Sequence, residues 1–201
     1  QGPRGLRRQP RLLSLIAAAR GFPAFADCSN KHGMGSVLVP NAASALPVVD
    51  SGPLVAADVA RGVTRLLLRH DCTAMAEVPL DGGRRADLMA LDANGRIVIV
   101  EIKVSRSDLL GDGKWTDYLG HCDRYFWAVP AGFDAAILDT EAFLPERCGV
   151  LVADRYDAAV LREATTVPLA AATRKRCTLA FARRAARRLI GVTDPDAVQG
   201  W

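Results

Sequence analysis

The chain has 201 residues, half of them hydrophobic and about a quarter charged, which is enough for one well-packed domain with some length left over. Its five cysteines are odd in number and lack C-x-x-C spacing, which argues against a disulfide framework or a zinc ribbon and favours a reducing, cytoplasmic location. The net charge of +4 does not by itself indicate nucleic acid, because residues 1–33 hold six Lys/Arg and one Asp, whereas the rest of the chain holds 20 Lys/Arg and 21 Asp/Glu.

The first 50 residues are predicted to be a poorly ordered leader, since they contain Gly, Pro and Arg clusters and no sustained hydrophobic period. Met34 is a candidate for the natural start. The alternative is a signal peptide, because residues 12–19 are apolar after several arginines and residues 24–26 have a small-x-small pattern, but Arg20 interrupts the apolar segment. No apolar run approaches the roughly 18 residues of a transmembrane span, so no membrane partner is expected.

Order is predicted to begin near Asp58, with an amphipathic helix whose apolar residues recur at helical spacing: Val59, Val63, Leu66 and Leu67. Its arginines repeat every four residues, at Arg61, Arg65 and Arg69. We interpret these arginines as a solvated face, and contact with phosphate is the alternative.

After this helix the pattern changes to strands. Three strands are predicted at 73–80, 84–91 and 96–104, joined by glycine-containing loops into two hairpins. A helix within 105–122 follows, then strands at 124–129 and 149–153, an edge strand at 158–162, and a helix at 173–190. The order α-β-β-β-α-β predicts an α/β domain over residues 55–190, with a mixed central sheet flanked by helices and a C-terminal tail at 191–201.

The third predicted strand carries the chemistry. Ile97 to Val100 are uninterrupted and β-branched, as in a strand buried on both faces, yet the strand continues into Glu101 and Lys103. Strand alternation places Glu101 and Lys103 on one face and the neighbouring Ile102 on the other. Two charged side chains therefore share one environment.

Hairpin register decides which other side chains join them. A three-residue loop with a left-handed Gly95 pairs Asp92 with Arg96, which puts Asp87 opposite Glu101 and Arg85 opposite Lys103. In the first hairpin, a three-residue loop with a left-handed Gly83 pairs Leu80 with Arg84 and places Glu77 opposite Asp87. Three carboxylates are therefore predicted in a row across the sheet: Glu77, Asp87 and Glu101.

Carboxylates on strands about 4.8 Å apart repel one another, and a hard divalent ion such as Mg²⁺ or Mn²⁺ would relieve that repulsion. A bound metal can lower the pKa of an attacking water, and Lys103 can orient that water or stabilise phosphate charge. The alternative is an acidic face neutralised by salt bridges without a metal, through Lys103, Arg84 and Arg85. A two-residue turn at Gly82-Gly83 would favour this alternative, because Glu77 would then point away from Asp87.

Asp87 followed by Glu101-Ile102-Lys103, in α-β-β-β-α-β order, resembles the PD-(D/E)XK nuclease superfamily. A wider set of matching stretches is similar to the MmcB family of DNA repair proteins over about residues 55–190: Gly83 to Asp87, Val100 to Lys103, Lys114-Trp115, Tyr118, Cys122 to Arg124 and Ala128 to Pro130. The resemblance implies a restriction-endonuclease-like fold, a bacterial DNA-damage role, Asp87 and Glu101 as metal ligands, and Lys103 as the catalytic lysine. Ala86 stands where the superfamily motif usually has proline.

We therefore expect a Mg²⁺- or Mn²⁺-dependent DNA endonuclease of DNA repair, with Asp87, Glu101 and Lys103 as catalytic residues. The expected metal ligands are Glu77, Asp87, Glu101 and Ile102. The alternative is a catalytically silent DNA-binding or recruiting module that acts with other DNA repair proteins.

The DNA-binding residues are predicted at two places. Near the site these are Arg84, Arg85 and Lys114, whereas Trp115 and Tyr118, beside Lys114, are predicted to pack in the core rather than stack on bases. The last helix has seven cations between residues 174 and 188 and no carboxylate, and its predicted DNA contacts are Arg183, Arg184, Arg187 and Arg188. A solvated basic face is the alternative. Leu179, Ala182, Ala186 and Leu189 lie along one side of this helix. A membrane surface is disfavoured because Leu179, Phe181 and Leu189 are expected to pack on the domain.

Overall fold

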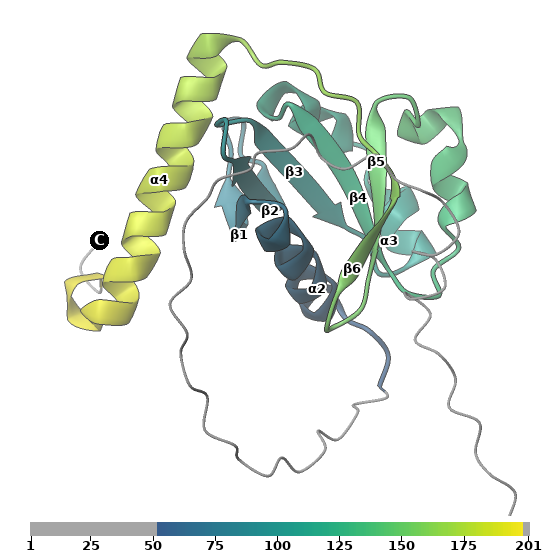
Figure 1. The fold of residues 1–201 in the computed structure, drawn as a ribbon, viewed down its shortest axis with the longest axis horizontal. Helices are drawn as coiled ribbons and strands as arrows, with labels where there is room; N and C mark the ends of the chain where they lie inside the picture. The colour runs from purple at the N-terminus through teal and green to yellow at the C-terminus, as the bar shows by residue number, and fades with distance from the viewer. Residues whose placement is uncertain (1–51, 199–201) are drawn as a thin grey trace, which may run out of the picture. The chain divides into compact units, whose positions relative to one another are not determined.

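The computed structural model describes residues 52–198, so the predicted leader, Met34 and the possible cleavage site lie outside the described residues. One compact unit begins at Leu54 and holds the described residues from there on. Its helices and strands, shown in Figure 1, are α2 (Ala56–Arg69), β1 (Cys72–Pro79), β2 (Arg85–Asp92), β3 (Ile97–Ile102), α3 (Arg106–Gly111), β4 (Arg124–Pro130), β5 (Cys148–Ala153), β6 (Ala158–Arg162) and α4 (Ala171–Thr193). Short 3₁₀ turns lie at Trp115–His121, Ala135–Asp139, Glu141–Phe143 and Pro195–Val198. The predicted α-β-β-β-α-β order and the α/β class are confirmed.

The six strands form one mixed sheet in the order β1-β2-β3-β4-β5-β6. The first three strands are antiparallel neighbours, β3 to β5 are parallel, and β6 returns antiparallel at the edge. The predicted edge strand at 158–162 is therefore confirmed. Each parallel pair requires a connection that crosses one face of the sheet, and these connections carry the short helices of the domain.

Both hairpins have the predicted register. In the first, Val78 pairs with Ala86 and the Leu80 amide donates to the Arg84 carbonyl at 2.8 Å, so the loop has three residues rather than two. Gly82 and Gly83 both have positive φ, at 83° and 75°. In the second hairpin the Asp92 amide donates to Arg96 at 3.1 Å, and Gly95 has φ of 73°. Glycine adopts these conformations at no steric cost, which is why the loops determine the register.

Helix α2 covers one face of the sheet, and its predicted apolar residues are buried: Val59, Val63, Leu66 and Leu67. They pack on the side chains of β3 that alternate away from Glu101, namely Val98, Val100 and Ile102. Two arginines of the α2 stripe bind the turn between β5 and β6, because Arg65 donates to the Tyr156 carbonyl at 3.0 Å and Arg69 pairs with Asp157. These contacts give the stripe a structural role.

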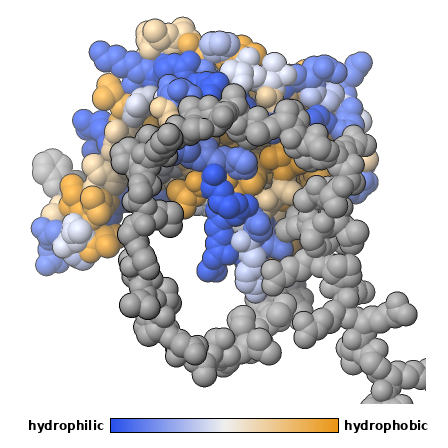
Figure 2. Space-filling model, in the orientation of Figure 1, coloured by the Kyte–Doolittle hydropathy of each residue, from blue (hydrophilic) through white to orange (hydrophobic). Residues whose placement is uncertain are grey.

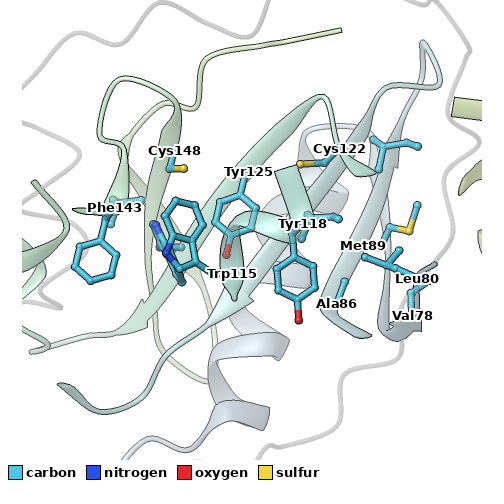
Figure 3. Packing of buried hydrophobic residues seen from close by; sticks show 14 of the residues in the cluster. Val78, Leu80, Ala86, Met89, Trp115, Tyr118, Cys122, Tyr125, Phe143 and Cys148 are labelled. Carbon is cyan, nitrogen blue, oxygen red and sulfur yellow. The ribbon is translucent and has the colours of Figure 1, made fainter. Parts of the chain in front are cut away.

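The opposite face of the sheet carries an aromatic cluster (Figure 3). Trp115 lies edge-on to Trp127, with ring centres 4.9 Å apart, and the ring centre of Tyr125 lies 5.2 Å from that of Trp127. Trp115 and Tyr118 are 6% and 8% exposed, so the prediction that they pack in the core is confirmed. Edge-to-face pairs of this kind add to the stabilisation from burial alone.

The helix predicted within residues 105–122 is confirmed as the short α3, and a separate 3₁₀ turn follows it. Helix α3 begins after Ser105, whose hydroxyl accepts the Asp108 amide at 3.1 Å, and ends at Gly111. A 3₁₀ turn follows from Trp115. The break falls at Asp112-Gly113, where glycine weakens the helix and where Asp112 turns its carboxylate toward β3.

Helix α4 is fastened to the sheet by Asp123, which is fully buried at the start of β4. Its carboxylate accepts two bonds of 2.6 Å from Arg174, one of 2.7 Å from the Ile97 amide and one of 2.9 Å from the Leu169 amide. The helix runs to Thr193, three residues beyond its predicted end. No helix among the described residues has the length and hydropathy needed to cross a membrane.

The predicted packing of α4 on the domain is confirmed for Phe181 and wrong for Leu179 and Leu189. The expected row is exposed, with Leu179 at 53% and Leu189 at 65%, and the buried residues are Cys177 and Phe181. Arg174, Cys177 and Phe181 follow one another at i, i+3 and i+7, so the ion pair to Asp123 turns this face toward the sheet. Leu179 is two positions from both Cys177 and Phe181, about 200° around the helix, and therefore points away.

Candidate functional site

The site forms where β2 and β3 separate. Their ladder ends with Leu88 opposite Val100, and the next residues, Asp87 and Glu101, continue this register without pairing. The Ile102 amide donates to Asp87 Oδ2 at 2.8 Å instead of to a strand carbonyl. A carboxylate thus replaces the backbone acceptor, and Asp87 is held against the end of β3.

Glu101 and Lys103 lie on the aromatic face and are each only 5% exposed. Lys103 Nζ lies 3.4 Å from Glu101 Oε1 and 2.7 Å from Asp112 Oδ2, so Asp112 is its closer partner. The second oxygen of Glu101, Oε2, is buried without a hydrogen-bond partner. Burying a polar oxygen without a partner costs free energy, and the cost is larger when the group is charged.

The two neighbouring carboxyl groups resist ionisation. Burial and the charge of Asp87 raise the pKa of Glu101 to about 8, although Lys103 acts to lower it. Burial also raises the pKa of Asp87, against the lowering effects of the Ile102 hydrogen bond and the Lys103 charge. Without a further positive charge, Glu101 therefore retains a proton at neutral pH.

The environment of Lys103 favours its charged form. Burial lowers the pKa of Lys103, but the hydrogen bond to Asp112 and the charges of Glu101 and Asp112 raise it by more, so the net pKa is above its ordinary value. The lysine is therefore a fixed cation rather than a proton acceptor at neutral pH.

These features fit a divalent cation at Asp87 and Glu101. A hard cation would bind the Glu101 oxygen that has no partner, and it would offset the repulsion between the two carboxyl groups. The Ile102 backbone carbonyl, next to Glu101 in sequence, is a candidate for a further ligand. Among residues 52–198, no group of three or more His, Cys, Asp or Glu side chains is arranged to hold a metal. The side-chain ligand set is thus a pair, and backbone and water oxygens would have to complete the coordination.

Glu77 occupies the predicted position but its carboxylate points elsewhere. Its neighbours in β1 pair in the expected register, Ala76 with Leu88 and Val78 with Ala86, so Glu77 falls opposite Asp87. Its φ of 58° interrupts the strand, and its side chain binds Arg85 at 2.6 Å. A role for Glu77 as a metal ligand stays a prediction.

Two of the predicted DNA-binding residues near the site already pair with carboxylates of the chain. Arg85 is paired with Glu77, and Arg84 binds Asp117 at 2.8 Å. Lys114 is exposed at the start of the 3₁₀ turn. On α4, Arg183, Arg187 and Arg188 are exposed and Arg184 is partly buried.

Sequence reasoning missed Asp112 and the backbone contact of Tyr118. Asp112 lies nine positions after Lys103, and the Tyr118 hydroxyl donates to the Arg85 carbonyl at 3.1 Å. Glycines on both sides of Asp112 signal a helix end. They do not indicate that the carboxylate returns to β3, because that contact depends on how the crossover packs.

Comparisons with known proteins bear on the class of protein. A family model described as DNA repair protein MmcB-like matches residues 48–196. No curated protein matches the chain. A solved structure of a protein of unknown function from Silicibacter pomeroyi is 40% identical, with a TM-score of 0.67, and the match covers 76% of this chain and 99% of that one. SfsA from Pyrococcus furiosus, solved in complex with Ca²⁺, is 16% identical over 53% of this chain and 60% of that one, and its TM-score of 0.25 is too low to support any argument.

Proposed function

Because the chain belongs to the MmcB-like family of DNA repair proteins, we propose that it is a metal-dependent nuclease that hydrolyses phosphodiester bonds in DNA. The observation that carries the proposal is the buried Glu101 carboxyl group, which has one oxygen without a partner and lies beside Asp87 and Lys103. Charged groups seldom enter a buried strand without a functional reason. The PD-(D/E)XK pattern of the same residues supports this reading.

Asp87 and Glu101 would hold Mg²⁺ or Mn²⁺, with the Ile102 carbonyl as a further ligand and Glu77 as an outer support. Such a cation neutralises charge on the scissile phosphate and lowers the pKa of water. Asp87 is already positioned for this role by the Ile102 amide, which fixes one of its oxygens at 2.8 Å.

Lys103 would supply a positive charge at a fixed place. Its ammonium group has three donors, of which one faces Asp112 and one faces Glu101. The third remains for a phosphate oxygen or for the attacking water. Because Asp112 anchors the amine, little side-chain freedom is lost when DNA binds.

DNA would be held mainly away from Arg84 and Arg85, because both already pair with carboxylates. Lys114 and the α4 residues Arg183, Arg184, Arg187 and Arg188 make no ion pair within the described part of the chain, and we propose them as contacts to the DNA backbone. Such contacts position DNA without reading its sequence.

A second candidate function is a DNA-binding or recruiting module without catalysis. The observations that favour it are the salt bridges of Glu77 to Arg85 and of Lys103 to Asp112, which neutralise charge at the site without a metal. Under this reading the chemistry belongs to another DNA repair protein.

A cleavage assay decides between the two candidates. The purified full chain is incubated with duplex, single-stranded, flapped and lesion-bearing DNA in Mg²⁺, Mn²⁺ or EDTA, beside Asp87→Ala, Lys103→Ala and the exposed control Glu141→Gln. We expect cleavage that requires the cation and falls about 100-fold or more in the first two variants only. Cleavage that is unchanged in both variants would contradict the assignment, and DNA binding without cleavage on every substrate would favour the recruiting module.

A further inference from the structure

The second half of α4 contacts the rest of the described structure only in part, with Ala185 packed against the core. The two buried residues of the helix, Cys177 and Phe181, both lie in its first half, and none is buried from Ala182 onward. Four large apolar side chains of the helix are exposed: Leu179 in the first half, and Leu189, Ile190 and Val192 in the second. Figure 2 shows hydrophobic and hydrophilic residues side by side at the C-terminal end of α4. Apolar residues gathered on one helix face mark an interaction surface more often than scattered ones do.

Two rows run along this exposed surface. Leu179, Ala182, Ala186 and Leu189 follow one another at i, i+3, i+7 and i+10, the spacing of a seam that packs on another helix. We call this row the apolar stripe. Beside it, about 90° around the helix, runs a row of arginines at i, i+7 and i+11, formed by Arg176, Arg183 and Arg187. Arg176 already pairs with Asp81 at 2.5 Å, so Arg183 and Arg187 are the members of the row that remain for a partner.

The charges of the chain argue against two candidates that could cover the apolar stripe, a second copy of α4 and the first 51 residues of the chain. α4 has no Asp or Glu between Ala171 and Thr193, so pairing with α4 of a second copy would bring arginines against arginines. Residues 1–51 carry six Lys/Arg and two Asp, so that segment has the same sign of charge as the helix. DNA would neutralise the arginines but would leave the leucines in water.

We propose that the apolar stripe of α4 docks an acidic amphipathic helix of a partner protein. Leucine-type side chains of the partner would cover Leu179 and Leu189, and its Glu or Asp residues would face Arg183 and Arg187. The partner and DNA would share these arginines and therefore compete for them, whereas the leucines serve the protein partner alone. This docking does not depend on whether the chain cuts DNA.

The test uses a synthetic peptide of four heptads with Leu at positions a and d and Glu at e and g. Controls are an isomer with Lys at e and g and a scrambled sequence. Anisotropy titrations with the full chain should show the Glu peptide binding at least about 10-fold tighter than either control. Leu179→Ser with Leu189→Ser should weaken binding about 10-fold or more and leave DNA affinity unchanged. Leu68→Ser, at an exposed leucine of α2, should change neither affinity.

Reversing the charge of the arginines gives a more discriminating test. The double variant Arg183→Glu, Arg187→Glu should no longer bind the Glu peptide and should bind the Lys peptide instead. A surface that binds only through hydrophobic contacts would not change its preference in this way. Equal binding of the scrambled peptide, or indifference to the leucine changes, overturns the proposal. Two further results would overturn it. In the first, sedimentation shows that the wild-type chain self-associates and the Leu179→Ser, Leu189→Ser variant does not. In the second, the wild-type chain binds lipid vesicles and the same leucine variant does not.

Discussion

Glu101 is a carboxyl group that the fold holds in an unfavourable place. It lies in a buried strand beside Asp87, and one of its oxygens has no partner. Two arrangements relieve this cost, a retained proton or a bound cation, and the first excludes the second because a metal needs the ionised form. The protonation of this one residue therefore controls both the stability of the metal-free protein and its affinity for metal.

Stability should depend on pH through Glu101. The ordinary pKa of 4.5 describes the unfolded chain and about 8 the folded chain, so between these values the folded state holds a proton that the unfolded state has released. Stability therefore falls as pH rises through this window. In EDTA, Glu101→Gln should become more stable than the wild type by a few kcal/mol as pH is raised from 5 to 8.5, since each pKa unit corresponds to about 1.4 kcal/mol.

Urea unfolding at the two pH values measures this difference, with Glu141→Gln as an exposed control that should follow the wild type. A Glu101→Gln curve that stays parallel to the wild type at both pH values would contradict the pKa shift.

Metal affinity should depend on pH in the opposite direction. A cation must displace the Glu101 proton, so Mn²⁺ binding should strengthen as pH rises toward 8, approaching about tenfold per pH unit, and level off above it. Calorimetry at pH 6.5, 7.5 and 8.5 gives the affinity and the released proton. Asp87→Asn should abolish binding, and a pH-independent affinity would place the metal elsewhere.

At the residue scale, the site could be predicted from the sequence because of the glycines in the two hairpin loops. Gly83 and Gly95 determine the loop lengths, and the loops place Asp87 and Glu101 in register. Sequence reasoning did not foresee the positive φ of Glu77, because strand propensity assumes continuous pairing. It also could not find Asp112, whose contact with Lys103 crosses from a loop back to the sheet.

At the element scale, the attachment of α4 depends on one buried carboxylate. Asp123 joins the start of β3, the chain before α4 and Arg174 through four hydrogen bonds. Although burial acts to raise its pKa, the bonds from Arg174, Ile97 and Leu169 lower it overall. The carboxylate therefore remains charged at neutral pH and holds the first turn of the helix.

Loss of that charge should loosen α4. Asp123→Asn should cost about 3 kcal/mol of unfolding free energy, because it removes the fully buried charge that pairs with the partly exposed Arg174. Asp139→Asn, which removes an exposed ion pair with Arg162, should cost less than about 1 kcal/mol. Urea unfolding compares the two, and equal costs would show that Asp123 is not the main attachment.

Elements were predicted best where burial sets the pattern. β3 to β5 are apolar runs bounded by turns, and α2 has four apolar residues at helical spacing. The helix predicted within residues 105–122 fills only the first part of that range, because Gly111 and Gly113 interrupt it. The buried face of α4 was misassigned because its many alanines allow two apolar rows, and the ion pair of Arg174 with Asp123 selects the one that holds Phe181.

At the scale of the whole molecule, charge is divided between the sheet domain and its last helix. Residues 52–170 carry 18 Asp/Glu and 13 Lys/Arg, whereas α4 carries seven Lys/Arg and no acid. The net charge of +4 conceals this separation. DNA would be attracted to α4 and repelled by much of the remaining surface.

The salt dependence of DNA binding should therefore depend on α4. Replacing Arg183, Arg184, Arg187 and Arg188 with Gln should reduce the slope of log affinity against log salt by up to about 4, since each phosphate contact contributes about 0.9. Anisotropy titrations from low to high salt measure it. Arg61→Gln, at an exposed arginine of α2, should leave the slope unchanged, and an unchanged slope in the α4 variant would move the DNA surface elsewhere.

Fold class and the two hairpins followed from the succession of elements, because short glycine-containing loops pair neighbouring strands. The path of the crossovers did not follow, since it depends on how the aromatic residues near Trp115 pack against Trp127. For this reason the two hairpins could be predicted while the contacts around Lys103 could not.

The separation of β2 and β3 leaves the Ile102 amide bonded to a group that can change its charge. An amide of a strand ladder donates to a carbonyl, whose charge is fixed, whereas the Ile102 amide donates to the Asp87 carboxylate. Its proton resonance and its rate of exchange with solvent should follow the state of that carboxylate. One backbone signal in the middle of the sheet would thereby record when the site gains a proton or a cation, without any label being added.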